Sequence, residues 1–376
     1  MIKYLSKTDK NKLKGTAVVR LDFNTEDDWR MKAALPTLKF LIKAGVKVLI
    51  LSHRGRPQEG GKSQIANRKA NDKLSLRKDV GILGRLLKKK IGFISGFDFK
   101  EIRETLKKAS EGSVFLLENL RFLPGEEKNS KKLAKDLAKL GNFYVNDAFA
   151  VSHRANASMA AITKFLPSYA GLGLEEELKH LAKVVNNPIR PLVLLVGGGK
   201  AKDKVEVLKN LEKKADALIL GGAVANTILF LQGRDIGDSV VDRKDNKIFM
   251  PIINFKNLIL PVDFKYSGKK ILDIGPQTIR VFSDAIKGAG TVVWNGPLGL
   301  IEDNRFREGS LAMARAITKN RKCFSLVGGG ETVMFLKKYK LDKKFSFVST
   351  GGGAMLDFFA GKKLPGLIAL GIEKQR

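Results

Sequence analysis

The stretch PLVLLVGGGK, residues 191–200, joins an unbroken apolar run to three glycines and a lysine. A continuous apolar run of this kind is typical of a strand buried on both faces, as strands in parallel sheets are. Glycines at the end of such a strand let bare backbone N–H groups, and the positive end of a following helix dipole, face an anion directly. We therefore predict a buried parallel strand here, followed by a turn that binds an anion, with phosphate as the expected anion.

Two further glycine triplets follow apolar runs in the second half of the chain. Gly328-Gly329-Gly330 comes after KCFSLV, and Gly351-Gly352-Gly353 comes after FSFVST. For a single triplet, an equally good explanation is that glycines only permit a tight strand-to-helix turn. Three triplets in one half of the chain favour phosphate binding.

Short apolar runs with helical patterns between them recur along the whole chain. They are TAVVRLDF (16–23), VKVLILS (46–52), SVFLLE (113–118) and NFYVND (142–147) in the first half, and PLVLLV (191–196), DALIL (216–220), NLILPVD (257–263), GTVVWN (290–295), KCFSLV (322–327) and FSFVS (345–349) in the second. This alternation indicates right-handed βαβ crossovers and parallel sheets. At 376 residues, the chain also exceeds the size at which one hydrophobic core usually keeps growing. The predicted fold class is α/β, with two doubly wound parallel-sheet (Rossmann-like) domains joined by a hinge helix.

The segment GLGLEEELKHLAKVVNNP, residues 171–188, predicts the helix between the domains. It has an acidic first turn, apolar residues at helical spacing and a stop at Asn186-Asn187-Pro188. We expect an N-terminal domain over residues 1–171 and a C-terminal domain over residues 172–376, with the connecting helix at about 172–186. The C-terminal segment, about 362–376, is expected to pack back on the N-terminal domain.

The composition indicates a soluble globular protein. Hydrophobic residues make up 44% of the chain and charged residues 28%. No apolar run approaches the roughly 18 residues that a bilayer span needs. The N-terminal MIKYLSKTDKNKLKG lacks the hydrophobic stretch of a secretory signal, so a cytoplasmic location without membrane contact is expected. The single cysteine, Cys323, lies in an apolar run and is expected to be a buried, inert thiol.

The chain is strongly basic, with 69 Lys and Arg against 38 Asp and Glu and a formal net charge of +31. Such an excess favours anionic partners and keeps nucleic acid among them. The basic residues are spread over both halves and often lie on helical patterns. This distribution indicates a solvated, lysine-rich surface and disfavours a dedicated nucleic-acid-binding tail.

In the first half, the predicted strands are followed by polar residues that include arginine. These sets are Arg20, Asp22 and Asn24; Ser52, His53, Arg54 and Arg56; Glu118, Asn119 and Arg121; and Asp147, His153 and Arg154. Strand ends carry the ligand-binding groups in open α/β sheets, and guanidinium groups bind phosphate or carboxylate with paired donors. A single arginine is more often part of a surface ion pair, but arginine at four strand ends in succession predicts an anion site. The two histidines lack acid or cysteine ligands at metal-like spacing, and each is as readily a structural residue as a substrate contact.

The second half offers candidate groups for a nucleotide. Lys200 and Lys204 are four residues apart, on one helix face if the helix begins near Ala201, beside the N–H groups of Gly198 and Gly199. Further candidates are Gly328 to Thr332, in which Glu331 is placed to reach Mg²⁺ and Thr332 to donate to phosphate, together with Gly221, Gly222 and the loop WNGPLGLIE with Glu302 as a ribose partner. The sequence contains no P-loop, no dinucleotide GxGxxG and no protein-kinase signature. An arginine-rich site in one half and a glycine-rich site in the other predict phosphoryl transfer across a cleft.

Nine segments resemble, in order, the signature segments of the phosphoglycerate kinase family. They are VRLDFN, SHRGRP, LLENLRF, VNDAFAVSHRANAS, VGGGKAKDK, DIGPQT, VVWNGPLG, VGGGET and STGGGAMLDFFAGKKLPG. The resemblance covers essentially the whole chain. It implies a reversible phosphotransferase reaction of glycolysis and gluconeogenesis, in which the acyl phosphate of 1,3-bisphosphoglycerate passes to ADP, giving 3-phosphoglycerate and ATP. It also implies Mg²⁺ bound with ATP or ADP, and a monomer.

The resemblance also implies which residues contact each substrate. The implied triose-phosphate ligands are Asp22, Asn24, Arg30, His53, Arg56, Arg121 and Arg154. The implied nucleotide ligands are Lys200, Lys204, Gly221, Gly222, Asn295, Pro297, Glu302, Gly329, Gly330, Glu331 and Thr332, with Glu331 reaching the metal of the Mg-nucleotide. The implied catalytic groups are Arg30, Lys200, Lys204, Gly330 and Gly353, which would meet the phosphoryl group in transit.

Four features depart from the family pattern. Glu331 stands where the family usually has Asp, the loop from Asn24 to Arg30 is short and lacks Val-Pro after DFN, Arg54 replaces an apolar residue, and Asn156 replaces the second histidine of HRAH. Two alternatives stay open. One is a catalytically impaired family member with a binding or regulatory role. The other is a basic nucleic-acid-binding protein, which predicts a steep salt dependence of DNA or RNA binding.

Overall fold

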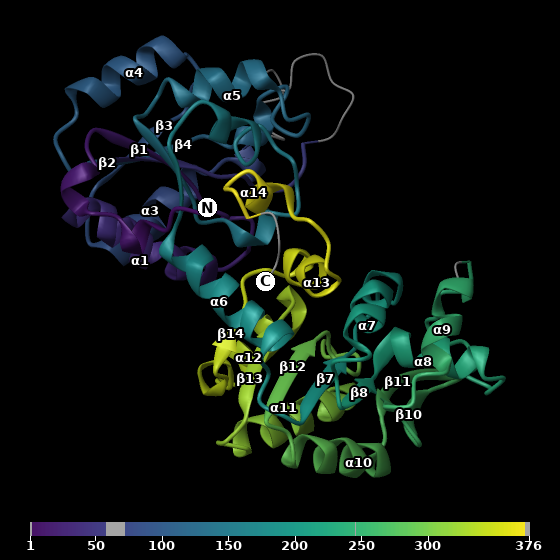
Figure 1. The fold of residues 1–376 in the computed structure, drawn as a ribbon. Coiled ribbons are helices and arrows are strands. Elements are labelled where there is room, and N and C mark those ends of the chain that lie inside the picture. Colours follow the sequence, from purple (N-terminus) through teal and green to yellow (C-terminus); the bar gives the residue numbers. More distant parts are fainter. Residues whose placement is uncertain (1, 58–71, 245, 373–376) are drawn as a thin grey trace. The chain divides into compact units, whose positions relative to one another are not determined.

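The structure is a computed structural model that describes residues 2–57, 72–244 and 246–372 (Figure 1). The chain divides into two compact units, each described here by itself. The first unit runs to Leu178 and takes in the C-terminal segment that begins at Lys363, and the second unit runs from Lys179 to Lys362. The division falls inside α6 (Leu172–Asn186), the helix expected from the sequence, whereas the sequence placed the boundary at the start of that helix.

The first unit contains a six-stranded sheet in the order β3-β4-β2-β1-β5-β6, and all neighbouring strands are parallel. Its strands are β1 (Thr16–Arg20), β2 (Lys47–Leu51), β3 (Ile91–Ile94), β4 (Val114–Leu117), β5 (Phe143–Asn146) and β6 (Ser168–Ala170). Every residue of the central strand β1 is buried, as expected for a strand that helices cover on both faces.

Helices cover both faces of this sheet. They are α1 (Trp29–Lys43), α3 (Arg77–Leu87), α4 (Phe99–Lys108) and α5 (Lys131–Ala138). Figure 1 shows α1 and α3 on one face and α4 and α5 on the other. The short helix α14 (Pro365–Ile368) belongs to the same unit, where the N–H of Gly366 donates to the carbonyl of Ser152 at 2.8 Å.

The start of α6 is held by Asp147, a polar residue at the end of β5. Asp147 Oδ1 accepts a hydrogen bond from the N–H of Leu174 at 2.7 Å. A Cβ atom on Gly171 would lie 2.5 Å from the Asp147 carboxyl group, and one on Gly173 would lie 2.9 Å from it, so both glycines leave room for this cap. Burial raises the pKa of Asp147 to about 6. This strand-end residue therefore orders a helix start within the first unit.

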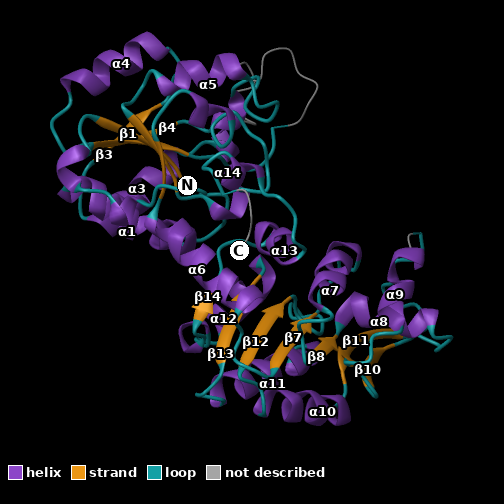
Figure 2. Cartoon of the chain, viewed as in Figure 1, coloured by secondary structure: helices purple, strands orange, loops and turns teal. Residues whose placement is uncertain are grey.

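The second unit contains a six-stranded parallel sheet in the order β14-β13-β12-β7-β8-β9 and a separate two-stranded antiparallel hairpin (Figure 2). The sheet strands are β7 (Leu192–Val196), β8 (Ala217–Leu220), β9 (Leu258–Ile259), β12 (Thr291–Asn295), β13 (Phe324–Gly328) and β14 (Phe347–Val348). The hairpin consists of β10 (Phe264–Ser267) and β11 (Lys270–Ile274).

The helices of the second unit are α7 (Val205–Leu211), α8 (Gly222–Leu231), α9 (Met250–Ile253), α10 (Pro276–Lys287), α11 (Glu308–Lys319), α12 (Gly330–Lys338) and α13 (Gly353–Phe359). The core joins apolar residues of α10, α11 and α12 to β7 and β12, with the fully buried Trp294 among them. Among the described helices, none is both long enough and apolar enough to cross a membrane.

The predicted fold class is confirmed, with a parallel α/β sheet in each unit. Each of the ten quoted apolar runs overlaps a strand, and β7 lies within the stretch PLVLLV. Three features were not predicted from the sequence: β3, the three-residue β6 and the antiparallel hairpin β10–β11. Gly92 weakens the strand signal of β3, β6 is only three residues long, and the hairpin interrupts the βαβ pattern on which the prediction depended.

Candidate active site

The loops at the carboxyl ends of the strands carry most of the predicted site residues. In the first unit these loops follow β1, β2, β4 and β5, and in the second they follow β7, β8, β12, β13 and β14. Because parallel strands end at the same edge of a sheet, loops far apart in the sequence meet there. Each unit therefore has one edge at which candidate groups gather.

In the first unit, Asp22 orients Arg30. Asp22 Oδ2 lies 2.5 Å from Arg30 Nη1, which places the first turn of α1 against the end of β1. Asp22 Oδ1 lies 3.8 Å from Nδ1 of His53 and accepts a hydrogen bond from the N–H of Asn24 at 2.9 Å. Asp22 and His53 are both buried. Three predicted site residues are therefore fixed around one carboxylate.

Arg20 fixes the protonation of His53. Arg20 Nη2 lies 3.2 Å from His53 Nδ1, and because a guanidinium can only donate, Nδ1 must accept. Burial, followed by the positive charges of Arg20, Arg121, Arg154 and Arg30, lowers the pKa of His53 well below its ordinary value of 6.5. The ring is therefore neutral at pH 7 and carries its proton on Nε2, which is a donor.

Arg20 itself is a structural residue. It is fully buried, and its Nε donates to Ser158 Oγ at 2.9 Å. Ser158 Oγ donates in turn to Glu126 Oε1 at 2.5 Å, and Asn156 Nδ2 approaches the same oxygen at 3.3 Å. The buried carboxylate of Glu126 thus balances the buried guanidinium through one hydroxyl group. Asn156, which departs from the family pattern, is part of this network.

Three arginines from separate loops lie within electrostatic range of one another. Burial, and then the charges of Arg154, Arg20 and Arg56, lower the pKa of Arg121 to about 10 against the opposing charge of Glu127. Burial and then the charge of Arg56 lower the pKa of Arg154. Arg56 is exposed. Positive charges this close repel one another and gain stability when an anion binds among them, so this cluster suits phosphate or carboxylate.

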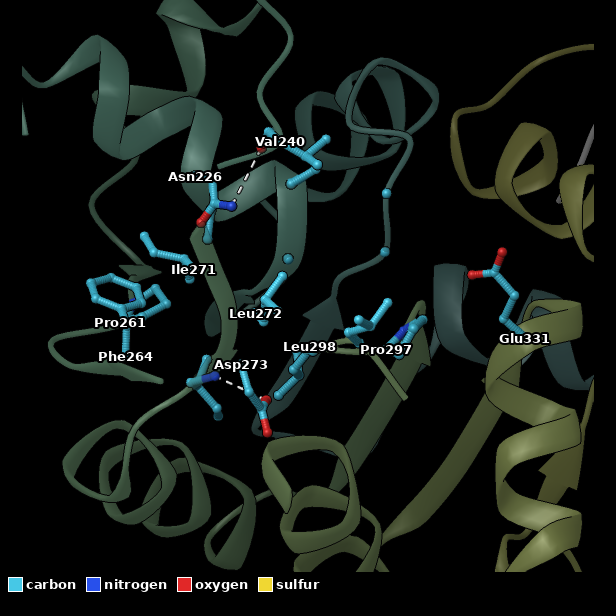
Figure 3. Close-up of a pocket in the computed structure, with 18 of the residues that line it drawn as sticks. Asn226, Val240, Pro261, Phe264, Ile271, Leu272, Asp273, Pro297, Leu298 and Glu331 are labelled. Atoms are coloured by element: carbon cyan, nitrogen blue, oxygen red, sulfur yellow. Dashed lines mark hydrogen bonds between the residues drawn. The ribbon is translucent and has the colours of Figure 1, made fainter. Parts of the chain in front are cut away.

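The second unit contains a pocket of about 270 Å³ (Figure 3). Its predicted residues are Gly198, Gly199, Gly222, Pro297, Glu302 and Glu331. The predicted loop WNGPLGLIE also contributes Leu298, Gly299 and Leu300. The sequence did not predict the rest of the lining, which consists of Ala223, Ala225, Asn226, Val240, Pro261, Phe264, Ile271, Leu272, Asp273 and Ile274.

The unpredicted part of the lining is largely apolar. Phe264 comes from β10, and Ile271 and Leu272 come from β11, so the hairpin supplies one wall. Figure 3 shows Pro261, Phe264 and Ile271 on one side of the pocket and the Glu331 carboxylate on the other. An apolar wall opposite a polar rim suits a heterocyclic base attached to a charged group.

Lys204 is held close to the end of β12. Its side chain is buried, and Nζ donates to Asn295 Oδ1, while Asn295 Nδ2 donates to the carbonyl of Gly328 at 3.1 Å. Burial lowers the pKa of Lys204 to about 8, and the charges of Asp203 and Glu331 oppose that shift. Asn295 therefore positions the lysine, and its amide is occupied by protein groups.

Helical backbone begins close to Ala201, which caps a 3-10 turn, Lys202–Lys204, that leads into α7. The expected shared helix face is not formed, because Lys200 lies in the exposed loop before this turn. The two ammonium groups nevertheless interact, since the charge of Lys200 contributes to lowering the pKa of Lys204.

Two predicted backbone donors are already used within the protein. The N–H of Gly198 donates to the carbonyl of Pro297 at 2.7 Å, and the N–H of Gly221 donates to the carbonyl of Val196 at 2.9 Å. The prediction that Gly198 faces an anion with a free N–H is therefore wrong, because the loop after β12 lies against it. Thr332 is also engaged: its side chain is fully buried, and Oγ1 accepts a hydrogen bond from the N–H of Gly296 at 3.0 Å.

The three glycine triplets share a pattern that the sequence alone did not show. The middle glycine of each triplet has a positive φ: 91° at Gly198, 98° at Gly329 and 49° at Gly352. The third glycine of each is exposed, and a Cβ atom built on it would meet nothing within 4 Å; these are Gly199, Gly330 and Gly353. The middle position thus serves the turn, and the third leaves open space beside the backbone. Gly330 and Gly353 begin α12 and α13.

Asp273 is a further polar residue of the pocket that the sequence did not predict. It is buried, and its carboxylate accepts hydrogen bonds from the N–H groups of Ile274 and Gly309, each at 2.9 Å. Burial raises its pKa to about 6. The signal that could have revealed this part of the pocket is the Ser267-Gly268 turn, since a glycine between two short polar-apolar runs is typical of a hairpin.

Phosphoglycerate kinases match nearly the whole chain. The family model for phosphoglycerate kinase matches residues 9–362. The phosphoglycerate kinase of Chloroflexus aggregans is 39% identical, and the aligned region covers 94% of this chain and 95% of that protein. The phosphoglycerate kinase of Coprothermobacter proteolyticus is 38% identical, and the aligned region covers 95% of this chain and 96% of that protein.

Solved structures agree as well. The phosphoglycerate kinase structure from Coxiella burnetii has a TM-score of 0.82 at 34% identity and covers 100% of both chains. That from Pyrococcus horikoshii has a TM-score of 0.83 at 29% identity and covers 99% of both. The chain belongs to the phosphoglycerate kinase family.

Proposed function

We propose that this chain is an active kinase of glycolysis and gluconeogenesis. It transfers the phosphoryl group reversibly between the acyl phosphate of 1,3-bisphosphoglycerate and ADP, and the products are 3-phosphoglycerate and ATP. The observation that supports this function best is the cluster of Arg30, Arg121 and Arg154 around a neutral His53 in the first unit, with Arg56 in electrostatic range of Arg121 and Arg154. Several cations around one buried histidine form a site for a small molecule with phosphate and carboxylate groups.

In this proposal the first unit binds the three-carbon substrate. Arg56, Arg121 and Arg154 bind its phosphate, and His53 donates through Nε2. Arg30, held by Asp22, extends toward the phosphoryl group in transit. Asn24 Oδ1 accepts a hydrogen bond from the N–H of Gly55 at 2.8 Å, and this orients its Nδ2 group as the donor offered to the substrate.

The second unit binds the nucleotide. The apolar wall formed by the hairpin receives the base, and the exposed Glu302 reaches the ribose. Lys200, Lys204 and the amides near Gly330 and Gly353 face the phosphates. The exposed carboxylate of Glu331 lines the same pocket and provides the hard oxygen ligand that Mg²⁺ prefers, so it fits a magnesium ion carried by the nucleotide. When bound, that ion supplies charge neutralisation for the phosphate oxygens.

This reaction needs no general base. The acceptor in the ATP-consuming direction is a carboxylate, which is already ionised at neutral pH. The protein must instead place the acceptor in line with the γ-phosphoryl group and neutralise the charge on the oxygens of that group. Arg30, Lys200 and Lys204 supply positive charge, and no aspartate is required to remove a proton.

Because the two substrates bind to separate units, the units must approach each other for in-line transfer. We place the hinge in the region of α6, and we expect a cytoplasmic monomer with Mg²⁺ as the working metal. The direct experiment is an assay with purified protein, 3-phosphoglycerate and MgATP, in which acyl-phosphate formation is measured. We expect steady turnover. A folded protein that binds both substrates without turnover would instead be an impaired family member, and one that binds neither would contradict the proposal.

A further inference from the structure

Arg54 connects the loop after β1 to a helix on the face of the first sheet. Its Nη1 donates to the carbonyl of Thr25 at 2.9 Å, and its Nη2 donates to Asp79 Oδ1 at 2.7 Å. Thr25 lies in the loop that leads to Arg30, and Asp79 lies in the first turn of α3. One guanidinium group therefore attaches the segment that carries Arg30 to α3.

The anchor at α3 is buried. The side chain of Asp79 is 3% exposed, and that of Arg54 is 24% exposed. The backbone of Arg54 is also fixed, because its carbonyl accepts a hydrogen bond from Asn119 Nδ2 at 2.8 Å. A buried carboxylate paired with a fixed guanidinium restricts where that guanidinium can point, and removal of either partner leaves the other charge uncompensated. The donor that Arg54 offers to Thr25 is therefore held in one place.

The other described hydrogen bonds of residues 23–27 are mostly local. The N–H of Asn24 donates to Asp22, the N–H of Thr25 donates to the carbonyl of Phe23 at 2.9 Å, and Thr25 Oγ1 donates to the carbonyl of Asp27 at 2.9 Å. Longer connections come from the loop after β2. Ser52 Oγ accepts a hydrogen bond from the N–H of Phe23 at 3.0 Å, the N–H of Gly55 donates to Asn24 Oδ1, and Arg54 donates to the carbonyl of Thr25. Of these, only Arg54 reaches as far along the loop before Arg30 as Thr25.

We propose that Arg54 is a positioning residue for phosphoryl transfer: by joining Thr25 to Asp79, it holds the short loop that directs Arg30 at the phosphoryl group. The inference rests on the proposed function. An apolar side chain at position 54 could form neither bond, so the role belongs to the arginine of this chain. Arg54 acts through Arg30 and does not itself contact the substrate.

The first test is kinetic. Arg54→Met removes both hydrogen bonds while keeping an unbranched side chain. We expect kcat to fall about tenfold, while KM for ATP stays unchanged because the second unit binds the nucleotide. In an Arg30→Ala background the same substitution should change kcat by less than twofold, since the group it positions is already gone. Equal tenfold losses in both backgrounds would overturn the proposal.

Two further variants control this test. Arg54→Lys keeps the positive charge opposite Asp79 but offers a single ammonium group, and we expect a smaller loss of kcat. Because Arg54→Lys preserves the ion pair with Asp79, it can replace Arg54→Met in the kinetic test if Arg54→Met fails to fold. Arg77→Met removes an exposed arginine from the start of α3, where its guanidinium lies 4.7 Å from the Phe93 ring, and it should leave kcat unchanged. If Arg77→Met lowered kcat as much as Arg54→Met does, a specific positioning role for Arg54 would be contradicted.

A second test does not depend on activity. Trp29 adjoins Arg30, whose guanidinium lies 5.5 Å from the indole ring, and the chain contains two tryptophans. In protein labelled with 5-fluorotryptophan, Arg54→Met should shift or broaden the ¹⁹F signal of Trp29 and leave that of the buried Trp294 in place. Trp29→Phe assigns the signals. An unchanged Trp29 signal would overturn the positioning role, whereas absent turnover in the wild type would contradict only the proposed function.

Discussion

Lys204 shows how burial adjusts one side chain to its task. Its ammonium group is buried beside Asn295, and its pKa is lowered to about 8. The ammonium form is favoured below that pKa and is lost as the pH rises through it. A nucleotide phosphate placed next to Nζ would favour the charged form, because an adjacent negative charge raises the pKa of a lysine.

The affinity for ATP should therefore fall as the pH rises through about 8. The charge that binds the phosphates is lost when Lys204 releases its proton. In Lys204→Arg the guanidinium stays charged, so its affinity should remain level between pH 7 and 9. Calorimetric titration with ATP at a series of pH values checks this. A level profile for the wild type would show that Lys204 does not bind the nucleotide.

Arg30→Ala should lower kcat by about 100-fold or more, by analogy with the loss of one preorganised donor to a developing charge. Asp22 already holds Arg30 in place, so the enzyme does not reorganise this group during the reaction. Lys32→Ala is the matched control, since Lys32 is an exposed cation on the same helix and pairs with Asp28 at 2.8 Å. Steady-state assays of both variants measure kcat and test whether the loss is specific to Arg30. Near-normal turnover by Arg30→Ala would remove this residue from the mechanism.

Within each glycine triplet, the middle glycine forms the turn after the strand and the third glycine leaves open space beside the backbone. Gly329, with φ of 98°, forms the turn that leads from β13 into α12. Gly330 begins the helix and has open space where a Cβ atom would be. Gly329 thus meets a conformational requirement, and the adjacent Gly330 leaves room for a ligand to approach the backbone. Substitutions at the two positions can test these roles separately.

Gly329→Ala should destabilise the protein by about 1–3 kcal/mol, because a positive φ is strained for a residue with a side chain. Gly330→Ala should leave the free energy of unfolding unchanged or slightly increased, since alanine favours a helix. If the backbone at Gly330 meets the phosphates, the added methyl group should raise KM for ATP several-fold. Urea unfolding and steady-state assays of both variants measure these effects. If Gly330→Ala left both KM and kcat unchanged, a role for this backbone in binding phosphate would be excluded.

The strands were more predictable than the site. The run LVLLV of β7 is apolar throughout and is buried throughout, so residue type alone identified it. The occupied N–H of Gly198 was not predictable, because its acceptor belongs to Pro297, about a hundred residues away. The hairpin β10–β11 has a local signal at Ser267-Gly268, but only its contacts with distant segments make it a pocket wall. Residue types thus identified the sheets, and contacts between distant segments determined which groups remain open to a ligand.

For the whole molecule, the two units carry different parts of one proposed reaction. The arginine cluster belongs to the first unit, and the pocket with Glu331 belongs to the second. Phosphoryl transfer requires the reacting atoms to come within about 3–3.5 Å of each other. The proposed function therefore requires the two units to close on each other when both substrates are bound.

The radius of gyration should fall when 3-phosphoglycerate and an unreactive MgATP analogue are both present, and it should change less with either ligand alone. Closure at a hinge is a usual response of enzymes whose substrates lie on separate domains. Small-angle X-ray scattering measures it directly. Identical scattering profiles with and without both ligands would argue against closure near α6.

In the proposed reaction, the phosphoryl group passes directly and in line from the nucleotide in one unit to a carboxylate in the other, without a covalent enzyme intermediate. The most direct measurement uses ATP made chiral at the γ-phosphorus with oxygen isotopes, and follows the configuration of the acyl phosphate that forms. One in-line displacement inverts the configuration, so we expect inversion. Retention would indicate two displacements through a phosphorylated enzyme group and would rule out direct transfer, as would the absence of labelled acyl phosphate.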